Sequence, residues 1–402
     1  MGYRLVDPRR TKWAGRRETF TVIALFVFAL AVRAGFRLYT GGFRTGADTG
    51  QYTRTCDALG QGLLNGVDGI VGIQYYGFVL PYCSVYNVGD YVLWGYSQLF
   101  LSALTAVLVY AIAKRIRDMK TGVVAALIFA VLVDSVRWSV EIMSETFFIF
   151  VIVLVLWRAL VARDHPSKPN LLILFLVTAW LAVTRPFGLP LIVVGAGLYG
   201  VTRYSHMIPN RFRVPAYVLL LLGSATMFVV GSVVFYPSVL THMWDQGFVF
   251  WRGEARPGVP LPGQIDSQSV LPGYPTLVQV AAFGVLLLST KVVAFFIPTQ
   301  YFWDPSHTVF FVFSLAYLPT LLFSAGGVYA LLKDNRETLA LLGAPILTMI
   351  LITMLLFVER RFRYRTPLAP SLAILAAVYL TPKLTALGRP DSDWLVRLRR
   401  HL

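Results

Sequence analysis

Charged residues are scarce in this sequence, and those present are unevenly divided between the two signs. Only 14% of the 402 residues are charged, whereas 56% are apolar, and the mean hydropathy is +0.65. Soluble proteins carry about 25% charged residues, so a large soluble domain is excluded. The same composition excludes a disordered chain, collagen and a coiled coil. It is typical of an integral membrane protein.

Acidic residues are the rarer of the two signs. The chain has 20 Asp and Glu against 36 Lys and Arg, which gives a net charge of +16. Such an excess can indicate nucleic-acid binding, but no basic run is interleaved with aromatic residues that could stack on bases. Cytoplasmic loops of membrane proteins collect Lys and Arg. We therefore expect membrane lipids as partners, and no nucleic acid.

Histidine and cysteine are also few. Five His and two Cys show no metal-ligand spacing, so the sequence predicts neither a metal site nor a cofactor. Cys56 and Cys83 both fall in a segment that we expect on the outer side of the membrane. Two interpretations stay open for them, a disulfide in an oxidising compartment or two unpaired loop cysteines.

Ten apolar segments are long enough to cross a membrane, which takes about 20 residues, although several need flanking residues to do so. They are Phe20–Leu38, Tyr91–Ala113, Gly122–Trp138, Thr146–Val161, Asn170–Thr184, Pro186–Val201, Val214–Phe235, Val309–Leu332, Leu339–Val358 and Pro367–Leu380. The first is too long for a cleavable signal, and no small-residue cleavage pattern follows it. We expect an all-α polytopic bundle of about ten membrane helices (range 9–11). It should form one domain over residues 1–402, without a separate soluble domain.

The segment 276–298 decides the topology. It is apolar enough to span, but it carries Lys291 and is bracketed by prolines. If it lies flat at the outer surface, both termini are cytoplasmic and 23 of the 36 Lys and Arg lie inside, against 20 if it spans. The first arrangement obeys the positive-inside rule better. It predicts a multi-pass protein of the plasma (inner) membrane, with interfacial helices in the outer loops 39–90 and 237–308 and 276–298 as an amphipathic segment.

Acidic residues on the expected outer side are candidates for chemistry. Asp48 and Tyr52 follow the first span four residues apart, so a helix would place them on one face. A carboxylate at the membrane boundary can accept a proton from a hydroxyl group, and the alternative for Asp48 is a helix N-cap. Glu141 and Glu145 repeat the spacing after the third span, where ionisable groups usually face a cavity or a partner. Arg137 could be that partner.

Arginines form a second group on the same side. Arg185 stands alone at the outer end of the fifth span, and Arg363 and Arg365 belong to a run of four before the last span. Arginine is disfavoured on this side of a membrane, and its guanidinium binds phosphate through paired hydrogen bonds. We expect Arg363 and Arg365, helped by Arg185 and Lys291, to hold a lipid phosphate. The alternative is nonspecific contact with anionic headgroups.

Four stretches, in this order, resemble the GT-C superfamily of membrane glycosyltransferases, in particular the protein O-mannosyltransferase and lipid A aminoarabinose transferase group. They are Asp48-x3-Tyr52, Met143-Ser144-Glu145-Thr146-Phe147-Phe148, Thr184-Arg185-Pro186 and Arg363-Tyr364-Arg365-x-Pro367. The resemblance covers about residues 18–382 and implies a GT-C-like bundle. No acidic metal-binding cluster of the oligosaccharyltransferase type is evident in the sequence.

These features predict an inverting glycosyltransferase that moves a sugar from a polyprenyl-phosphate-linked donor to an acceptor glycan, lipid or protein on the periplasmic face. Asp48 is the expected general base, and Tyr52, Glu141 and Glu145 are expected to shape the acceptor or sugar pocket. A single displacement opposite the phosphate inverts the anomeric centre. Two alternatives stay open: a transporter or flippase for a lipid-linked saccharide, and a polysaccharide ligase or polymerase with a pyrophosphate-linked donor.

Overall fold

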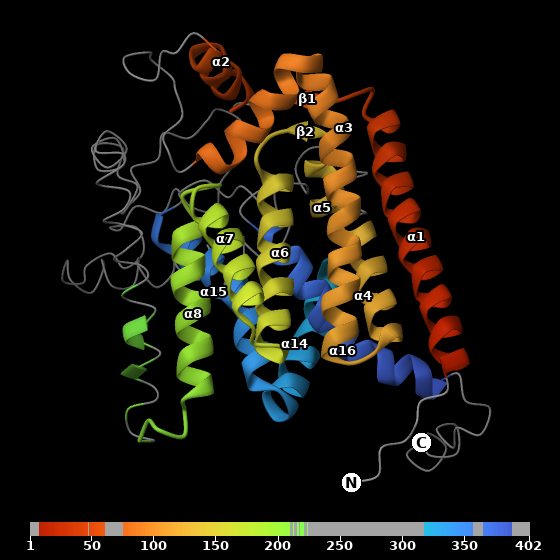
Figure 1. Ribbon diagram of the computed structural model, residues 1–402, viewed down its shortest axis with the longest axis vertical. Helices are drawn as coiled ribbons and strands as arrows, with labels where there is room; N and C mark the ends of the chain where they lie inside the picture. The colour runs from red at the N-terminus through yellow and green to blue at the C-terminus, as the bar shows by residue number, and fades with distance from the viewer. Residues whose placement is uncertain are drawn as a thin grey trace, which may run out of the picture.

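The computed structural model describes residues 8–46, 48–60, 75–209, a few positions between 212 and 223, 317–356 and 365–387. These residues form a bundle of helices with a two-stranded parallel sheet at one end (Figure 1). The elements are α1 (Pro8–Tyr39), β1 (Arg44–Thr45), α2 (Thr49–Gly60), α3 (Tyr76–Ile116), α4 (Met119–Val131), α5 (Val133–Trp138), β2 (Glu141–Ile142), α6 (Glu145–Asp164), α7 (Lys168–Ala182), α8 (Gly188–Arg203), α14 (Tyr317–Asp334), α15 (Arg336–Leu356), η5 (Thr366–Leu368) and α16 (Ala369–Leu387).

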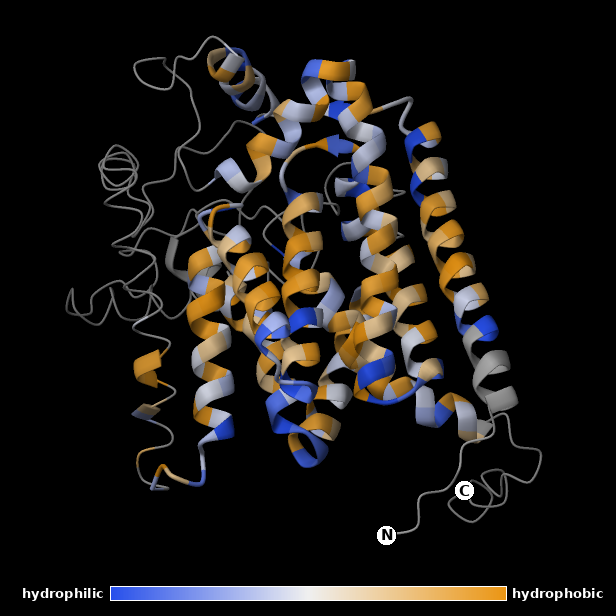
Figure 2. Cartoon of the chain, viewed as in Figure 1, coloured by the Kyte–Doolittle hydropathy of each residue, from blue (hydrophilic) through white to orange (hydrophobic). Residues whose placement is uncertain are grey.

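Membrane helices are present, as the composition predicts. Within the described residues, four helices are long and apolar enough to cross a membrane: Arg16–Tyr39, Tyr76–Ile116, Glu145–Asp164 and Thr366–Ala386. The helices α4, α7 and α8 are shorter and also apolar, and Figure 2 shows hydrophobic colour along most of the bundle. The predicted total of about ten stays a prediction. Most of the expected span 214–235, the loop 237–308 and the segment 276–298 lie outside the described residues.

Helix α3 is two helices joined at a kink. Gly89 (φ −153°, ψ 26°) and Asp90 (φ 65°, ψ −179°) leave the helical conformation. A positive φ is uncommon for a residue with a side chain, and the Asp90 carboxylate accepts a hydrogen bond from the Tyr91 amide at 2.5 Å. The apolar helix therefore restarts at Tyr91, where the sequence predicts a span to begin. Its first part, 76–88, lies with α2 in the loop for which interfacial helices are predicted.

The prediction of one continuous span over Gly122–Trp138 is wrong. Leu132 is extended (φ −61°, ψ 119°) and divides this stretch into α4 and α5. The Ser135 hydroxyl donates to the carbonyl oxygens of Phe129 at 2.7 Å and Leu132 at 2.8 Å. The Phe129 carbonyl oxygen thereby gains a donor at the end of α4, while the Leu132 carbonyl oxygen also accepts the amides of Ser135 and Val136. The break also places the Asp134 carboxylate inside the bundle, where it is buried.

Small residues let the central helices approach closely. Helix α16 packs on α14 and α4, and residues 369–378 are all buried (Figure 1). A Cβ atom at Gly327 of α14 would overlap the Leu375 carbonyl of α16, and one at Gly122 of α4 would lie 2.8 Å from the Tyr110 carbonyl oxygen of α3. Membrane helices commonly use such small residues for backbone contact.

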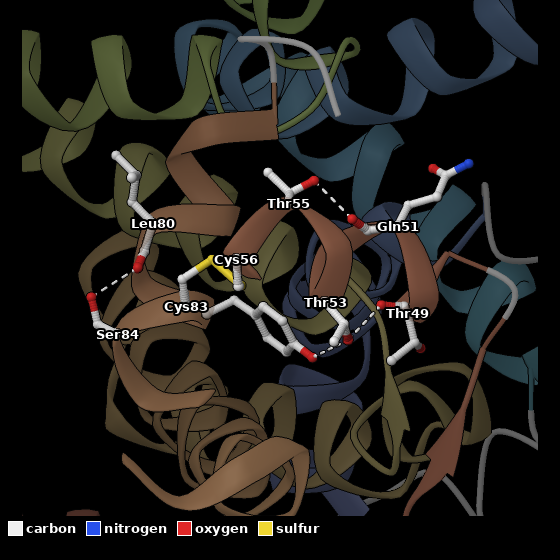
Figure 3. The surroundings of a disulfide bond; sticks show 9 residues. Thr49, Gln51, Thr53, Thr55, Cys56, Leu80, Cys83 and Ser84 are labelled. Atoms are coloured by element: carbon white, nitrogen blue, oxygen red, sulfur yellow. Dashed lines mark hydrogen bonds between the residues drawn. A yellow bond between two sulfur atoms is a disulfide. The ribbon is translucent and has the colours of Figure 1, made fainter. Parts of the chain in front are cut away.

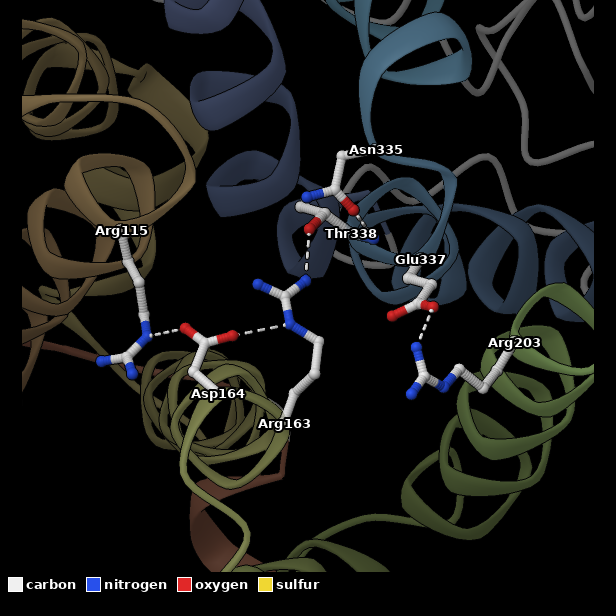
Figure 4. Close-up of polar contacts among 7 residues, drawn as sticks. All are labelled: Arg115, Arg163, Asp164, Arg203, Asn335, Glu337 and Thr338. Atoms are coloured by element: carbon white, nitrogen blue, oxygen red, sulfur yellow. Dashed lines mark hydrogen bonds and ion pairs between the residues drawn. The ribbon is translucent and has the colours of Figure 1, made fainter. Parts of the chain in front are cut away.

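The end of the bundle away from the sheet is held by ion pairs (Figure 4). The Asp164 carboxylate accepts hydrogen bonds from Arg115 at 2.6 Å and Arg163 at 2.9 Å, and Arg163 also donates to the Thr338 hydroxyl at 2.7 Å. These contacts join the ends of α3 and α6 to the start of α15. The loops predicted as cytoplasmic meet at this end, and the described loops predicted as outer meet at the other (Figure 1).

Candidate active site

The short parallel sheet brings together two loops that are far apart in the sequence. Arg44 of β1 aligns with Glu141 of β2, and Thr45 aligns with Ile142. The Thr49 hydroxyl, at the start of α2, donates to the Ile142 carbonyl oxygen at 2.7 Å and accepts from the Gly46 amide at 2.8 Å. The beginning of α2 is therefore held against the loop that leads into α6.

Asp48 lies in the turn that starts α2. Its carbonyl oxygen accepts the amides of Gln51 at 3.0 Å and Tyr52 at 3.2 Å, so its backbone occupies the N-cap position. The side chain is partly exposed. A carboxylate there lies at the positive end of the helix dipole, where it is accessible from outside the bundle.

Tyr52 extends from α2 into the bundle and is buried. Its ring packs at 4.8 Å from the Phe78 ring, and its hydroxyl donates to the Ser144 hydroxyl at 3.3 Å. The pKa of Tyr52 is raised well above its ordinary value of 10.0 by burial, then by neighbouring Tyr75, Glu145 and Asp48, against an opposing effect of Arg185. Both carboxylates and the guanidinium thus act on this one hydroxyl. Tyr52 stays protonated at neutral pH.

Glu145 and Arg185 form a buried ion pair. The Arg185 Nη1 atom lies 2.9 Å from Glu145 Oε1, and the side chains are 3% and 0% exposed. The guanidinium also faces the rings of Phe148 and Phe187, at 5.7 and 5.6 Å from their centroids. Burial alone would lower the pKa of Arg185, but the Glu145 carboxylate together with Tyr75 and Tyr52 more than offsets it, and the pKa is raised. Arg185 therefore stays charged at all physiological pH values.

The turn that carries Arg185 is fastened to the start of α3. The Gly77 amide donates to the Val183 carbonyl oxygen at 2.7 Å, and the Trp180 indole donates to the Gly77 carbonyl oxygen at 2.8 Å. A Cβ atom at Gly77 would lie 2.7 Å from the Thr184 hydroxyl, so this contact needs a glycine. The position of Arg185 is thus set by α3 as well as by its own turn.

A disulfide joins Cys56 of α2 to Cys83 of α3, with 5.2 Å between the Cα atoms (Figure 3). Of the two interpretations that the sequence leaves open, the structure has the bonded one. The hydroxyls of Thr53 and Tyr82 add a hydrogen bond of 3.4 Å between the same helices. Helix α2, which begins next to Asp48, is therefore held at its start by Thr49 and further along by Thr53 and Cys56.

The other predicted site residues lie elsewhere. Glu141 is in β2 and pairs with Arg137 at 3.1 Å, so it does not share a helix face with Glu145, and the expectation of a repeated helical pair is wrong. Arg365 donates to both carboxylate oxygens of Asp134, at 2.8 and 3.0 Å, in the interior of the bundle. Arg363 and Lys291 lie outside the described residues.

Sequence reasoning missed Asp134, Ser144 and Tyr75. Asp134 is a carboxylate inside an otherwise apolar stretch, which is a signal of function or pairing, and it could have been singled out. Ser144 stands next to Glu145 but has no role until the structure places it against Tyr52. Tyr75, with its ring 6.4 Å from that of Tyr52, shows no sequence signal.

The arrangement offers a carboxylate at an accessible helix start, with a buried ion pair and a neutral phenol behind it. Such a set can accept a proton at Asp48 and stabilise negative charge at Arg185. The Arg185 Nε atom is buried and has no hydrogen-bond partner within the described residues. In the same part of the chain, no group of three or more His, Cys, Asp and Glu could hold a metal ion.

Comparison with known proteins gives structural likeness only. No protein-family model and no curated protein matches the chain. The fold resembles the oligosaccharyltransferase AglB of Archaeoglobus fulgidus in complex with an inhibitory peptide and a dolichol-phosphate, with a TM-score of 0.52 and 12% identity over 96% of this chain. It also resembles the apo form of an oligosaccharyltransferase from Archaeoglobus fulgidus, with a TM-score of 0.54 and 14% identity over 91% of this chain.

The chain spans about half the length of these two proteins, 52% and 51%. Oligosaccharyltransferase AglB is a member of the GT-C superfamily. At such low identity the likeness shows the fold alone: the chain shares the helical bundle of these two proteins, and its membership of the GT-C superfamily stays a prediction. The closer resemblance to the O-mannosyltransferase and aminoarabinose transferase group stays a prediction.

Proposed function

We propose that the chain is an integral-membrane, inverting glycosyltransferase that takes its sugar from a polyprenyl-phosphate-linked donor. One observation carries this proposal: the first outer loop, with Asp48 and Tyr52, meets the Glu145–Arg185 pair at one end of a GT-C-like bundle. A proton acceptor and a fixed cation on the same side of a membrane are what transfer from a lipid phosphate requires.

Asp48 is the proposed general base. Its carboxylate takes the proton of the acceptor nucleophile while that nucleophile bonds to the anomeric carbon of the sugar. The bond between the anomeric carbon and the phosphate oxygen breaks at the same time, and the electron pair leaves with the lipid phosphate. A single displacement of this kind inverts the anomeric centre. Tyr52 and Glu145 shape the pocket behind the base.

Arg185 is the proposed ligand of the departing phosphate among the described residues. Glu145 binds its Nη1 atom and orients the guanidinium, while the buried Nε atom keeps a donor for an oxyanion. Arg363 and Lys291 remain proposed contributors. Arg365 is bound by Asp134, so we assign it the positioning of η5 and α16 instead of contact with the phosphate.

The side of the membrane follows from charge. The basic loops gather at the end away from β1 and β2, and the positive-inside rule makes that end cytoplasmic. The proposed site then faces the periplasm of an inner-membrane protein whose termini are cytoplasmic. The dolichol-phosphate and peptide bound to AglB support a lipid-phosphate donor and a separate acceptor site. The acceptor is a glycan, a lipid or a protein.

Asp48→Asn tests the proposal, with Asp57→Asn as the matched control, since Asp57 is an exposed acid on the same helix. Purified variants are supplied with a polyprenyl-phosphate sugar and membrane-extracted acceptors, and release of the lipid phosphate is followed. Loss of a general base lowers the rate about 10²- to 10⁴-fold, so we expect this loss for Asp48→Asn and none for Asp57→Asn. Equal rates in both variants would remove Asp48 from the mechanism, and transport without transfer in the wild type would identify a flippase.

A further inference from the structure

A fully buried arginine lies in α1, away from the candidate active site. The Arg33 guanidinium donates from Nε to the Ser102 hydroxyl of α3 at 2.5 Å, and from Nη1 to the carbonyl oxygens of Ala29 at 3.0 Å and Ala130 at 3.2 Å. Its Nη2 atom is buried and has no hydrogen-bond partner within the described residues. A donor left in this state costs free energy.

A second arginine lies one helical turn further toward the outer end of α1. The Arg37 guanidinium lies 4.7 and 4.9 Å from the centroids of the Phe43 and Tyr96 rings, which contact each other edge-to-face. Its Nε atom is buried and also lacks a partner in the described part of the chain. Residues four apart share one helix face, so Arg33 and Arg37 both point from α1 toward α3.

No carboxylate among the described residues forms an ion pair with either arginine, whereas Arg185 and Arg365 each hold one. The Ala130 carbonyl at the end of α4 offers Arg33 the negative end of a helix dipole, which compensates part of one charge. Within the described part of the chain these two positive charges otherwise lack a counter-ion, and such charges usually mark a ligand or a partner.

The seam between α1 and α3 is open to lipid. Tyr96 and Phe100 of α3 are 49% and 52% exposed, and the Phe100 ring contacts that of Phe26 on α1 at 5.3 Å. The predicted first span ends at Leu38. Arg37 and Arg33, about 3 and 9 Å from the last residue of α1 at 1.5 Å rise per residue, therefore lie at the outer end of that predicted span, close to the headgroups. If the phosphate of a lipid binds Arg37, the hydrocarbon chain of that lipid can therefore lie along these aromatic rings.

We propose that Arg33 and Arg37 bind the phosphate of a membrane lipid that ends in a phosphomonoester, such as a polyprenyl phosphate. The choice rests on charge, because a phosphomonoester carries close to two negative charges at neutral pH and the arginines supply two positive ones. A phosphodiester headgroup such as phosphatidylglycerol carries one. This site is separate from the Arg185 site and takes no part in bond breaking.

Binding of farnesyl phosphate to the full chain tests this site without any transfer reaction. Native mass spectrometry of the detergent-solubilised protein counts bound lipids, and a titration gives the affinity. Arg37→Gln is the principal variant because Arg37 is only half-buried, Arg33→Gln is the second, and Arg54→Gln, an exposed arginine of α2, is the matched control. If Arg33→Gln does not fold, Arg37→Gln is sufficient.

We expect Arg37→Gln to bind one farnesyl phosphate fewer than the wild type, or to bind it roughly 10- to 100-fold more weakly, the value of one charged hydrogen bond. Arg54→Gln should bind as the wild type does. If the active-site proposal is right, the wild type binds two farnesyl phosphate molecules and Arg37→Gln binds one. If the active-site proposal is wrong, the wild type binds one and Arg37→Gln binds none. Unchanged binding in Arg37→Gln overturns the site. Equal binding of phosphatidylglycerol, or full displacement by inorganic phosphate, overturns the assignment of the ligand.

Discussion

The buried pair of Asp134 and Arg365 joins residues 231 positions apart in the sequence, and its removal is the sharpest test of how the bundle is held. The two side chains are 2% and 0% exposed, and the guanidinium lies 4.1 Å from the centroid of the Tyr317 ring. Asp134→Ala leaves the guanidinium in the interior without its carboxylate. We expect the free energy of unfolding to fall by about 3–5 kcal/mol.

The double variant Asp134→Leu/Arg365→Met distinguishes the net contribution of the ion pair from the cost of leaving one buried charge without its partner. Both charges are removed together, so no uncompensated charge remains, and apolar side chains of similar volume take their place. We expect this variant to lose less stability than Asp134→Ala alone. The matched control is Glu337→Gln, which breaks the pair with Arg203 at the basic end, where the side chains are 25% and 58% exposed. Such an exposed pair contributes less than about 1 kcal/mol.

The assay is unfolding in mixed micelles, followed by tryptophan fluorescence for the wild type and the three variants. The expected order of stability loss is Asp134→Ala first, the double variant next and Glu337→Gln last. Equal losses for Asp134→Ala and Glu337→Gln would show that the buried pair is no stronger than an exposed one. A double variant less stable than Asp134→Ala would also refute the reasoning.

Three further predictions concern stability. Replacing both cysteines by alanine (Cys56→Ala/Cys83→Ala), or reducing the disulfide, should lower the free energy of unfolding by about 3.5 kcal/mol. This value is the loop-closure entropy for the 27-residue separation of the two cysteines, and the same unfolding assay with and without reductant measures it. Asp118 caps α4 by accepting from the Thr121 amide at 2.7 Å, and although burial raises its pKa, the hydrogen bonds from Thr121 lower it below 3.8. The stability contributed by this cap is present above pH 3.8 and is lost as the pH falls through the lowered pKa of Asp118. Asp118→Ala should therefore lower the free energy of unfolding by about 1 kcal/mol at pH 7 and by less at pH values below that pKa. Melting curves recorded over a series of pH values measure this difference. Burial raises the pKa of Tyr52 above 10.0, so the unfolded chain loses the phenol proton at a lower pH than the folded protein does, and stability falls as the pH rises past 10. Tyr52→Phe lacks this proton and should lose less stability than the wild type over that range. An equal loss of stability in both proteins would contradict the buried position of Tyr52.

Hydropathy predicts where apolar helices run, but not where they break. The stretch 122–138 is apolar enough for one span, and the sequence predicts one. In the structure Leu132 is extended, the Ser135 hydroxyl donates to the Phe129 carbonyl oxygen, and the Asp134 carboxylate pairs with Arg365, far away in the sequence. A break of this kind is stabilised by tertiary partners, which a window of sequence does not contain.

In the candidate site, too, the sequence predicts which residues matter but not which of them pair. Asp48, Tyr52, Glu145 and Arg185 could all be singled out from their types and positions, because ionisable groups beside apolar helices are costly and few. Their pairing could not be predicted. Spacing suggested Glu141 with Glu145, whereas the fold pairs Glu145 with Arg185, 40 positions further along the chain.

The amino-acid composition and the order of apolar runs by themselves determined that this chain is a helical membrane protein with polar loops segregated to two sides, because burial in lipid acts on each segment separately. Which loops touch, which arginine holds which carboxylate and which arginines are left without one were decided only by the tertiary structure. Those contacts join residues that are distant in sequence, and their energies depend on a burial that exists only once the helices have packed.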